Sequence, residues 1–318
     1  MLDGIKLFTG NANPELAQSI CKYLDINLGR ATVKTFSDGE IMVEIGENVR
    51  GKDIYVLQSA CHPVNDHLME LLIMIDALKR ASAARINVVF PYYCYSRQDR
   101  KVAPRVPISA KMVADLISVA GAHRLISLDL HANQIQGFFD IPVDNIFAAP
   151  VMLDYMKEDF KEDLDKGHFV IVSPDAGGVE RARAFAKRLA CGLAIVVKRG
   201  TEDLDKNAWE LIGEVKGMSC MILDDMVDTG KTLLRAVNAL HEAGAAKINA
   251  CCTHGVLSGD SVEQIEKSNL ESLIITDSVP LREKKDRTTK IEVLSVAPLL
   301  GETIKRVYHH DSVSSLFV

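Results

Sequence analysis

The sequence predicts an α/β protein with two similar domains, each a mainly parallel sheet flanked by helices. Short apolar runs alternate with amphipathic segments along the whole chain, which is the pattern of repeated β-α units. In addition, LLIMIDALKRASAARIN at residues 71–87 and LLRAVNALHEAGAAKIN at residues 233–249 match at nine of seventeen positions. In both copies a helix ends near alanine and a strand starts at Ile-Asn, which favours a duplicated domain.

The length of the chain agrees with this prediction. A chain of 318 residues is long enough for two domains of ordinary size. Pro150 and the charged stretch at residues 157–166 indicate a boundary near the middle. We expect an N-terminal domain over residues 1–147 and a C-terminal domain over residues 148–318. The last residues are expected to pack back on the N-terminal domain.

Each expected strand is a short apolar run, and each expected helix has the apolar periodicity of one buried face. The strands are expected at residues 5–9, 54–59, 86–90, 125–130, 169–173, 194–197, 221–223, 248–253 and 273–276. The helices are expected at residues 15–24, 66–81, 110–120, 179–189, 233–243 and 299–308.

Composition and charge exclude several classes of protein. A hydrophobic content of 47% is too high for a disordered chain, and a net charge of −6 argues against a nucleic-acid-binding protein. No apolar run approaches about 18 residues and no basic, apolar leader is visible, so we expect no membrane span and no signal peptide. The seven cysteines have no Cys-x-x-Cys spacing, which favours free thiols in a reducing cytoplasm.

The stretch MILDDMVDTGKT, residues 221–232, predicts a site for a phosphorylated sugar. A nucleotide P-loop needs glycine where Asp225 stands, and a carboxylate there would repel a triphosphate. The stretch instead indicates a short strand, then acids, then Thr229-Gly230 before a helix from Thr232. A helix N-terminus preceded by glycine binds anions, and the acids beside it suit sugar hydroxyls. The alternative is a plain strand-turn-helix with capping residues.

A second stretch, IVSPDAGGVERA at residues 171–182, repeats this arrangement. A strand ends, Asp175 follows, and Gly177-Gly178 open a helix. Two such anion sites in one half of the chain indicate a ligand with two separated phosphate groups, or two phosphorylated substrates. The alternative is that the glycines only permit a tight turn.

A third stretch, LDLHANQIQGFFDIPVDN, places Asp129 and His131 at the end of an expected strand, with Asp140 and Asp144 following. Carboxylates close to phosphates commonly hold Mg²⁺, directly or through water. Because Mg²⁺ prefers oxygen ligands, the histidine would have a minor or outer-shell role. A structural histidine is the alternative reading.

Three further stretches carry aromatic or basic side chains. FSDGE either presents Phe36 for stacking on a base or forms a plain hairpin turn. YSRQDRK, residues 95–101, gathers cations, and the planar arginine fork suits phosphate oxygens. VVKRG delivers Lys198 and Arg199 into a polar segment that is either a surface loop or a loop that closes over a transferring phosphoryl group.

Taken together, these motifs closely resemble those of class I ribose-phosphate pyrophosphokinases, over essentially the whole chain. The segments in the order of that family are FSDGE, NDHLMELLIMIDALKRASA, RQDRK, APRVPISAK, DLHANQIQGFFDIPVDN, VSPDAGG and DDMVDTGKT. The resemblance implies two phosphoribosyltransferase-like domains. It also implies an enzyme of nucleotide biosynthesis, which transfers the β,γ-diphosphoryl group of MgATP to the 1-hydroxyl of ribose 5-phosphate. The products would be 5-phosphoribosyl 1-diphosphate and AMP.

The resemblance assigns roles to individual residues. ATP would contact Phe36, Asp38, Gly39, Glu40, Arg97 and Gln98. Ribose 5-phosphate would contact Asp224, Asp225, Asp228, Thr229, Gly230 and Thr232, and Lys231, which is not the usual residue of the family, would add a phosphate contact. Mg²⁺ would be positioned by His131 and Asp175. The transferred group would be stabilised by Lys198, with the adjacent Arg199 as a substitute for the family's second arginine. A regulatory site for phosphate, the activator, and ADP, the inhibitor, would include Arg50, Arg105, Ser312, Ser314 and Phe317.

The resemblance further implies a cytoplasmic homo-oligomer, typically a hexamer, with an ATP site between FSDGE of one subunit and RQD of a neighbour. Catalysis would depend on positioning and charge neutralisation, without a covalent enzyme intermediate.

Two positions depart from the family pattern. Gly200 stands where a second catalytic arginine is usual, and Lys231 stands where a small residue is common. The alternative function is therefore a non-catalytic regulatory relative, which would be expected to lose several site residues. A plain phosphoribosyltransferase is a second alternative. It would share DDMVDTGKT, but it would not need FSDGE, RQD or the DLH stretch.

Overall fold

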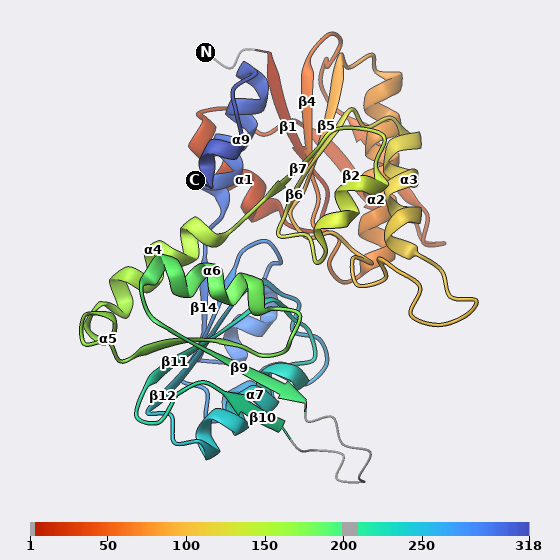
Figure 1. Cartoon of the computed structure of the whole chain (residues 1–318). Coiled ribbons are helices and arrows are strands. Elements are labelled where there is room, and N and C mark those ends of the chain that lie inside the picture. Colours follow the sequence, from red (N-terminus) through yellow and green to blue (C-terminus); the bar gives the residue numbers. More distant parts are fainter. Residues whose placement is uncertain (1–3, 199–208, 318) are drawn as a thin grey trace. The chain divides into compact units, whose positions relative to one another are not determined.

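The chain divides into two compact units, which are described separately. The computed structural model describes residues 4–198 and 209–317, and it is shown in Figure 1. Unit 1 comprises residues 1–148, 278–280 and 295–318, and unit 2 comprises residues 149–277 and 281–294. The chain thus returns to unit 1 for its last segment.

Unit 1 contains a parallel sheet with the strand order β1-β4-β5-β6-β7. Its strands are β1 (Ile5–Thr9), β4 (Asp53–Leu57), β5 (Arg85–Phe90), β6 (Arg124–Leu128) and β7 (Val143–Ile146). A separate antiparallel hairpin is formed by β2 (Ala31–Thr35) and β3 (Ile41–Ile45).

Helices cover both faces of the unit 1 sheet (Figure 1). The helices are α1 (Pro14–Leu24), α2 (Val64–Arg80), α3 (Ser109–Ala120) and α9 (Ala297–His309), with the short 3-10 turns η1 (Asn133–Phe138) and η3 (Ser314–Leu316). Helices α1 and α9 pack against each other on one face, and α2 and α3 pack together on the other. The core between α2, α3 and the sheet is made of aliphatic and aromatic side chains that are almost fully buried.

Unit 2 contains a larger sheet with the order β10-β9-β8-β11-β12-β13-β14, in which only the β9–β10 pair is antiparallel. The strands are β8 (Phe169–Ser173), β9 (Gly192–Lys198), β10 (Trp209–Ile212), β11 (Ser219–Val227), β12 (Lys247–Gly255), β13 (Ser272–Thr276) and β14 (Ile291–Leu294). The helices and the 3-10 turn are α4 (Ala149–Asp159), α5 (Lys161–Asp165), α6 (Val179–Leu189), α7 (Lys231–Glu242), α8 (Ser261–Lys267) and η2 (Arg282–Arg287).

The predicted α/β class with mainly parallel, helix-flanked sheets is confirmed. The two similar sequence segments occupy equivalent positions, because one spans α2 and β5 while the other spans α7 and β12. In the described part of the chain, no helix is both long enough and apolar enough to cross a membrane.

The strand order decides which predicted residues share an edge of a sheet. In unit 2, β9, β8 and β11 are parallel neighbours, so their carboxyl ends lie at one edge. Lys198 is the last residue of β9, Asp175 follows the end of β8, and Asp225 lies near the end of β11. This edge is where open parallel sheets bind ligands.

Candidate active site

The sugar-phosphate motif lies at the end of β11, although the strand is longer than the sequence predicts. The expected strand stopped at Leu223, but β11 continues to Val227 because β12 pairs with it as far as Gly255. Asp224 and Asp225 therefore lie within a strand and not in a loop after it. The following helix, α7, also begins one residue earlier than predicted, at Lys231.

The turn between β11 and α7 has the geometry of an anion site. Gly230 is buried and caps α7 in the left-handed conformation, with φ of 74°, which an L side chain adopts only with strain. The first amide N–H groups of a helix have no partner within it. Here they follow Gly230 directly, and the neighbouring Thr229, Lys231 and Thr232 are exposed. The turn can therefore present N–H groups, hydroxyls and an ammonium to a phosphate.

An arginine on α6 lies beside the two carboxylates of β11. Arg181 Nη1 is 3.8 Å from Asp224 Oδ1 and 3.6 Å from Asp225 Oδ1. The Asp225 amide also donates a hydrogen bond to Asp224 Oδ1, at 2.8 Å. Burial, together with the charge and hydrogen bonding of Asp225, raises the pKa of Asp224 from 3.8 to about 8, and Arg181 opposes this rise. Asp224 consequently retains a proton near neutral pH, and a bound cation would displace that proton.

This raised pKa predicts that Asp224→Asn stabilises the protein at alkaline pH. The folded chain holds a proton that the unfolded chain releases above pH 3.8, so the contribution of Asp224 to stability falls as the pH rises from about 4 to about 8. Each unit of pKa shift corresponds to about 1.4 kcal/mol. Thermal denaturation in metal-free buffer should show little difference between variant and parent at pH 4, and a growing advantage of the variant up to pH 8. Parallel curves for the two proteins would contradict the assignment.

At the second predicted anion site, after β8, the side chain of Asp175 stabilises the turn. Its Oδ1 accepts hydrogen bonds from the amides of Gly177 and Gly178, at 2.8 and 3.0 Å. Ser173 Oγ donates to the Asp175 carbonyl at 2.7 Å. Among the described residues Oδ2 of this exposed aspartate has no partner, so it can face a ligand or a hydrated cation while Oδ1 holds the turn.

In the DLH stretch two carboxylates have structural roles, and one histidine is exposed. Asp129 Oδ2 accepts a hydrogen bond from the Ala148 amide at 2.9 Å, and Asp144 forms an ion pair with Arg124 at 2.5 Å. These two carboxylates therefore hold the fold. His131 is exposed just beyond β6, which ends at Leu128 and not at residue 130 as expected.

The FSDGE motif forms the tip of the β2–β3 hairpin. The Phe36 amide donates to the Glu40 carbonyl at 2.7 Å, and Asp38 Oδ1 accepts from the Glu40 amide at 3.0 Å. Gly39 has φ of 94°, as the tight turn requires. Phe36 is 53% exposed, so a large aromatic ring projects from the tip and is free to stack on a base.

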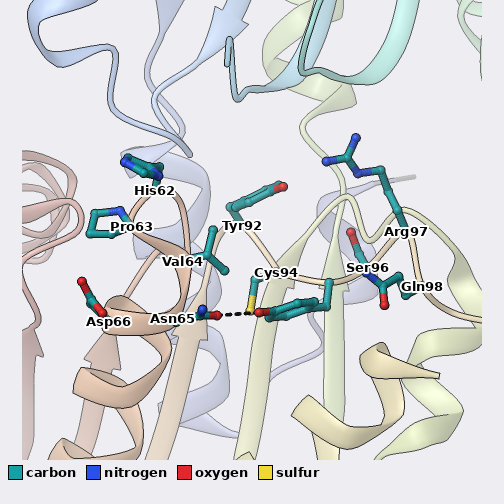
Figure 2. A pocket seen from close by; sticks show the side chains of 11 residues that line it. His62, Pro63, Val64, Asn65, Asp66, Tyr92, Cys94, Ser96, Arg97 and Gln98 are labelled. Atoms are coloured by element: carbon teal, nitrogen blue, oxygen red, sulfur yellow. Dashed lines mark hydrogen bonds between the residues drawn. The ribbon is translucent and has the colours of Figure 1, made fainter. Parts of the chain in front are cut away.

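Arg97 and Gln98 line a cavity of about 480 Å³ in unit 1 (Figure 2). The other lining residues come from the segments after β4 and β5, and they are His62, Pro63, Val64, Asn65, Asp66, Tyr92, Cys94, Tyr95 and Ser96. Gln98 is held in place because its Oε1 accepts a hydrogen bond from Ser109 Oγ at 2.5 Å. Tyr95, with φ of 58°, donates through its hydroxyl to Asn65 Oδ1 at 2.5 Å.

This cavity was only partly predicted. The sequence pointed to Arg97 and Gln98, but not to the proline-containing turn His62–Asp66 or to Tyr92. The missed signal was their position: both segments directly follow neighbouring parallel strands, whose carboxyl ends meet at one edge. The hairpin residues are not among those that line this cavity.

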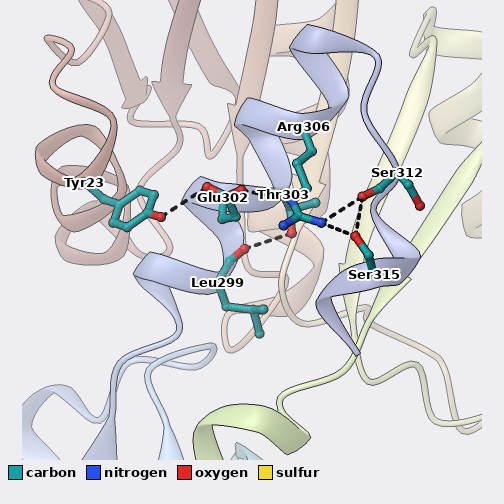
Figure 3. A network of polar contacts seen from close by, with 7 residues as sticks. All are labelled: Tyr23, Leu299, Glu302, Thr303, Arg306, Ser312 and Ser315. Carbon is teal, nitrogen blue, oxygen red and sulfur yellow. Dashed lines mark hydrogen bonds and ion pairs between the residues drawn. The ribbon is translucent and has the colours of Figure 1, made fainter. Parts of the chain in front are cut away.

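The C-terminal tail is fastened to α9 by a polar network (Figure 3). Arg306 Nε donates to Glu302 Oε1, and Arg306 Nη1 donates to the Ser312 carbonyl, both at 2.9 Å. Glu302 Oε2 accepts from the Tyr23 hydroxyl at 3.3 Å, which links the tail to α1. The hydroxyls of Ser312 and Ser314 share a hydrogen bond at 2.9 Å.

The remaining predicted regulatory residues also lie in unit 1. The Phe317 ring meets the edge of Phe147, with ring centroids 5.5 Å apart. Arg50 and Arg105 are exposed, and Arg105 has φ of 64°. Within residues 4–198 and 209–317, neither arginine forms an ion pair or hydrogen bond with the tail.

The two predicted metal residues belong to different units, and part of the predicted catalytic pair lies outside the described residues. His131 belongs to unit 1 and Asp175 to unit 2, and the described residues contain no group of three or more histidine, cysteine, aspartate or glutamate side chains that could hold a metal ion. Arg199 lies outside the described residues, as does Gly200. Lys198 is the last residue of β9, and its backbone reaches the same sheet edge as the end of β11.

Two parallel α/β units, one carrying a helix-N-terminal anion turn beside paired carboxylates, define a protein that binds phosphorylated, hydroxyl-bearing ligands. Residues 5–121 match the N-terminal domain of ribose phosphate pyrophosphokinase, and residues 201–318 match the phosphoribosyl synthetase-associated domain. The ribose-phosphate pyrophosphokinase of Nitrosomonas europaea is 52% identical over 318 residues, covering 99% of both chains. That of Rhizobium meliloti is 54% identical, over 98% of this chain and all of the relative.

A solved structure agrees with these sequence relatives. The phosphoribosylpyrophosphate synthetase of Mycobacterium smegmatis superposes with a TM-score of 0.91 at 44% identity, over 96% of this chain and 99% of that one. The chain belongs to the ribose-phosphate pyrophosphokinase family. The resemblance inferred from the motifs is confirmed, and so is the predicted fold class of two phosphoribosyltransferase-like domains.

Proposed function

We propose that the chain is an active ribose-phosphate pyrophosphokinase. It transfers the β,γ-diphosphoryl group of ATP to the 1-hydroxyl of ribose 5-phosphate, and it releases AMP and 5-phosphoribosyl 1-diphosphate. The observation that carries this proposal is the placement, in unit 2, of a helix-N-terminal anion turn beside two carboxylates. A sugar phosphate needs both features, one for its phosphate and one for its ring hydroxyls.

The ribose 5-phosphate site follows from this arrangement. The phosphate is held by the backbone of Gly230 and by the side chains next to it, namely Thr229, Lys231 and Thr232. The ribose hydroxyls are held by Asp224, Asp225 and Asp228. Lys198 stabilises the transferring group, a role that rests on the family motif alone, and Arg199 substitutes for the arginine that the family has at the position of Gly200.

Mg²⁺ is the proposed cofactor, and the donor set fits it. The site offers carboxylate oxygens, the ligand type that Mg²⁺ prefers, and burial together with the neighbouring charge of Asp225 raises the pKa of Asp224, which a bound cation would lower. Asp175 offers its Oδ2, which has no partner among the described residues, and His131 is proposed as a second contact, through water. When bound, Mg²⁺ neutralises charge on the diphosphoryl group. The residues of the chain hold the sugar in line with the diphosphoryl group and keep the attacking 1-hydroxyl of the sugar oriented.

ATP is proposed to use two separate features of unit 1. The cavity supplies Arg97 and Gln98, while the exposed hairpin tip supplies Phe36, Asp38, Gly39 and Glu40. Because the hairpin residues do not line the cavity, a site shared between subunits would bring the two features together. We therefore propose a homo-oligomer, with a hexamer as the expected form.

The proposed regulators are phosphate, which activates, and ADP, which inhibits. The residues assigned to them are Arg50, Arg105, Ser312, Ser314 and Phe317. The tail network supports this assignment in one respect, since it keeps the two serine hydroxyls side by side. A cytoplasmic location is proposed for an enzyme whose seven cysteines are all free thiols, four of them less than 2% exposed.

An assay of AMP release tests the function and both alternatives. The protein, ATP, Mg²⁺ and ribose 5-phosphate should yield AMP and 5-phosphoribosyl 1-diphosphate in equal amounts. A regulatory relative would release no AMP. A plain phosphoribosyltransferase would form a nucleotide from 5-phosphoribosyl 1-diphosphate only when a nucleobase is added. A Gly200→Arg variant measured in parallel shows whether the departure from the family motif limits the rate.

Arg97→Ala should raise KM for ATP by about tenfold, with a much smaller change in KM for ribose 5-phosphate. The variant loses one charged contact to the nucleotide, and such a contact contributes about 1.5–3 kcal/mol. Arg80→Ala is the matched control, because Arg80 forms only an exposed pair with Asp76 on α2. Equal KM changes for both substrates would remove Arg97 from the ATP site.

A further inference from the structure

The loop between β12 and α8, residues 256–260, is fastened to the sugar-phosphate turn. The Leu257 amide donates to the Val227 carbonyl, and the Ser258 amide donates to the Asp228 carbonyl, both at 3.0 Å. A third bond joins side chains, because Ser258 Oγ donates to Asp228 Oδ1. This loop therefore holds both the backbone and the carboxylate of Asp228.

The buried residue Leu257 fixes the backbone path of this loop. Leu257 is fully buried in the unit 2 core and has φ of 51°, a conformation that a leucine adopts only when its surroundings enforce it. The Ser258 carbonyl accepts from the Ser261 amide at 3.4 Å, at the start of α8. The serine hydroxyl is thus presented to Asp228 from a rigid support and not from a free loop.

We propose that Ser258 is a positioning residue for ribose 5-phosphate, acting through Asp228; this inference rests on the proposed function. A carboxylate has several acceptor sites, and the serine occupies one on Oδ1. With this oxygen held by the serine, the carboxylate has fewer orientations open to it, and the hydrogen bond favours the one in which Asp228 meets the ligand. Ser258 itself does not touch the substrate.

The two backbone hydrogen bonds of this loop make it possible to distinguish the positioning role of Ser258 from a purely structural one. They persist in Ser258→Ala, so the loop keeps its path while the carboxylate loses the hydroxyl that restrains it. We expect the melting temperature of Ser258→Ala to fall by no more than about 2–4 °C. Its KM for ribose 5-phosphate should rise about tenfold, while KM for ATP stays within about twofold, because one hydrogen bond from a hydroxyl to the charged carboxylate is lost.

The experiment compares three variants with the parent. Ser258→Thr keeps the hydroxyl and should restore most of the affinity for ribose 5-phosphate. Ser219→Ala is the control, since Ser219 is buried at the opposite end of β11 and its hydroxyl has no hydrogen-bond partner in the described part of the chain. This control should match the parent in both KM values. Calorimetric titration with ribose 5-phosphate in the absence of ATP should reproduce the tenfold loss for Ser258→Ala.

The possible outcomes distinguish the two levels of inference. If the parent releases no AMP and binds no ribose 5-phosphate, the proposed function fails, and the role of Ser258 fails with it. If the parent is active but Ser258→Ala binds ribose 5-phosphate as the parent does, the positioning role alone is wrong. An equal change in both KM values, or a threonine variant as weak as the folded alanine variant, would likewise overturn it.

Discussion

Replacing Asp225 with asparagine should lower kcat/KM for ribose 5-phosphate by about 10³-fold, which corresponds to about 4 kcal/mol. Asp225 is only 6% exposed, and its Oδ1 lies 3.6 Å from Arg181 Nη1, which also lies beside Asp224. The amide keeps the shape of the carboxylate, but it loses the charge and replaces one acceptor oxygen with a donor. The charge-assisted bonds to the ribose hydroxyls are lost, and Arg181 loses a counter-charge in a half-buried place.

Steady-state rates of AMP release over a range of ribose 5-phosphate concentrations measure this effect. Asp163→Asn is a control for the loss of a carboxylate. Asp163 forms an ion pair with Lys247, at 3.3 Å, at the start of β12, and the proposed sugar site lies at the other end of the sheet strands. The control should keep parental rates. A folded Asp225→Asn protein with less than tenfold loss would show that this carboxylate does not hold the sugar.

The anion turns were predictable because their signals are local. A glycine that must adopt positive φ, an acid that accepts the amides of a turn and an apolar strand before them all lie within one short stretch, as at Gly230 and Asp175. The extent of β11 was not predictable in this way. Asp224 and Asp225 interrupt its apolar pattern, and only pairing with β12 sustains the strand beyond Leu223.

The weaker strands and the cavity were missed for a related reason. Strands β2, β3 and β14 are partly exposed, and each carries a polar or charged residue within four or five positions, so their apolar signal is short. The cavity depends on β4 and β5 being neighbours, which brings His62 and Arg97 together from separate segments. Ser258 was also missed, because its partner Asp228 is close only through the β11–β12 pairing. Pairing between distant segments is the information that local pattern lacks.

Removing the charge of Arg181 should also have a large effect on activity, although the sequence motifs did not single this residue out. Arg181→Met removes the cation that opposes the rise in the pKa of Asp224, so this pKa should rise above about 8. Less of the carboxylate is then ionised at neutral pH. We expect kcat/KM for ribose 5-phosphate to fall by about 10²-fold at pH 7.5, with the pH–rate profile displaced to higher pH.

The sign of that displacement separates an electrostatic role from a steric one. If both carboxylates must be ionised to hold the sugar or a cation, losing Arg181 delays ionisation, and the rising limb of the profile moves to higher pH at a fixed magnesium concentration. Arg181→Lys keeps the charge without the planar fork, so it should restore the position of the limb but only part of the rate. Arg183→Met is the control, because Arg183 is exposed two residues further along α6. A profile that drops without moving in Arg181→Met would show that the arginine acts only through packing.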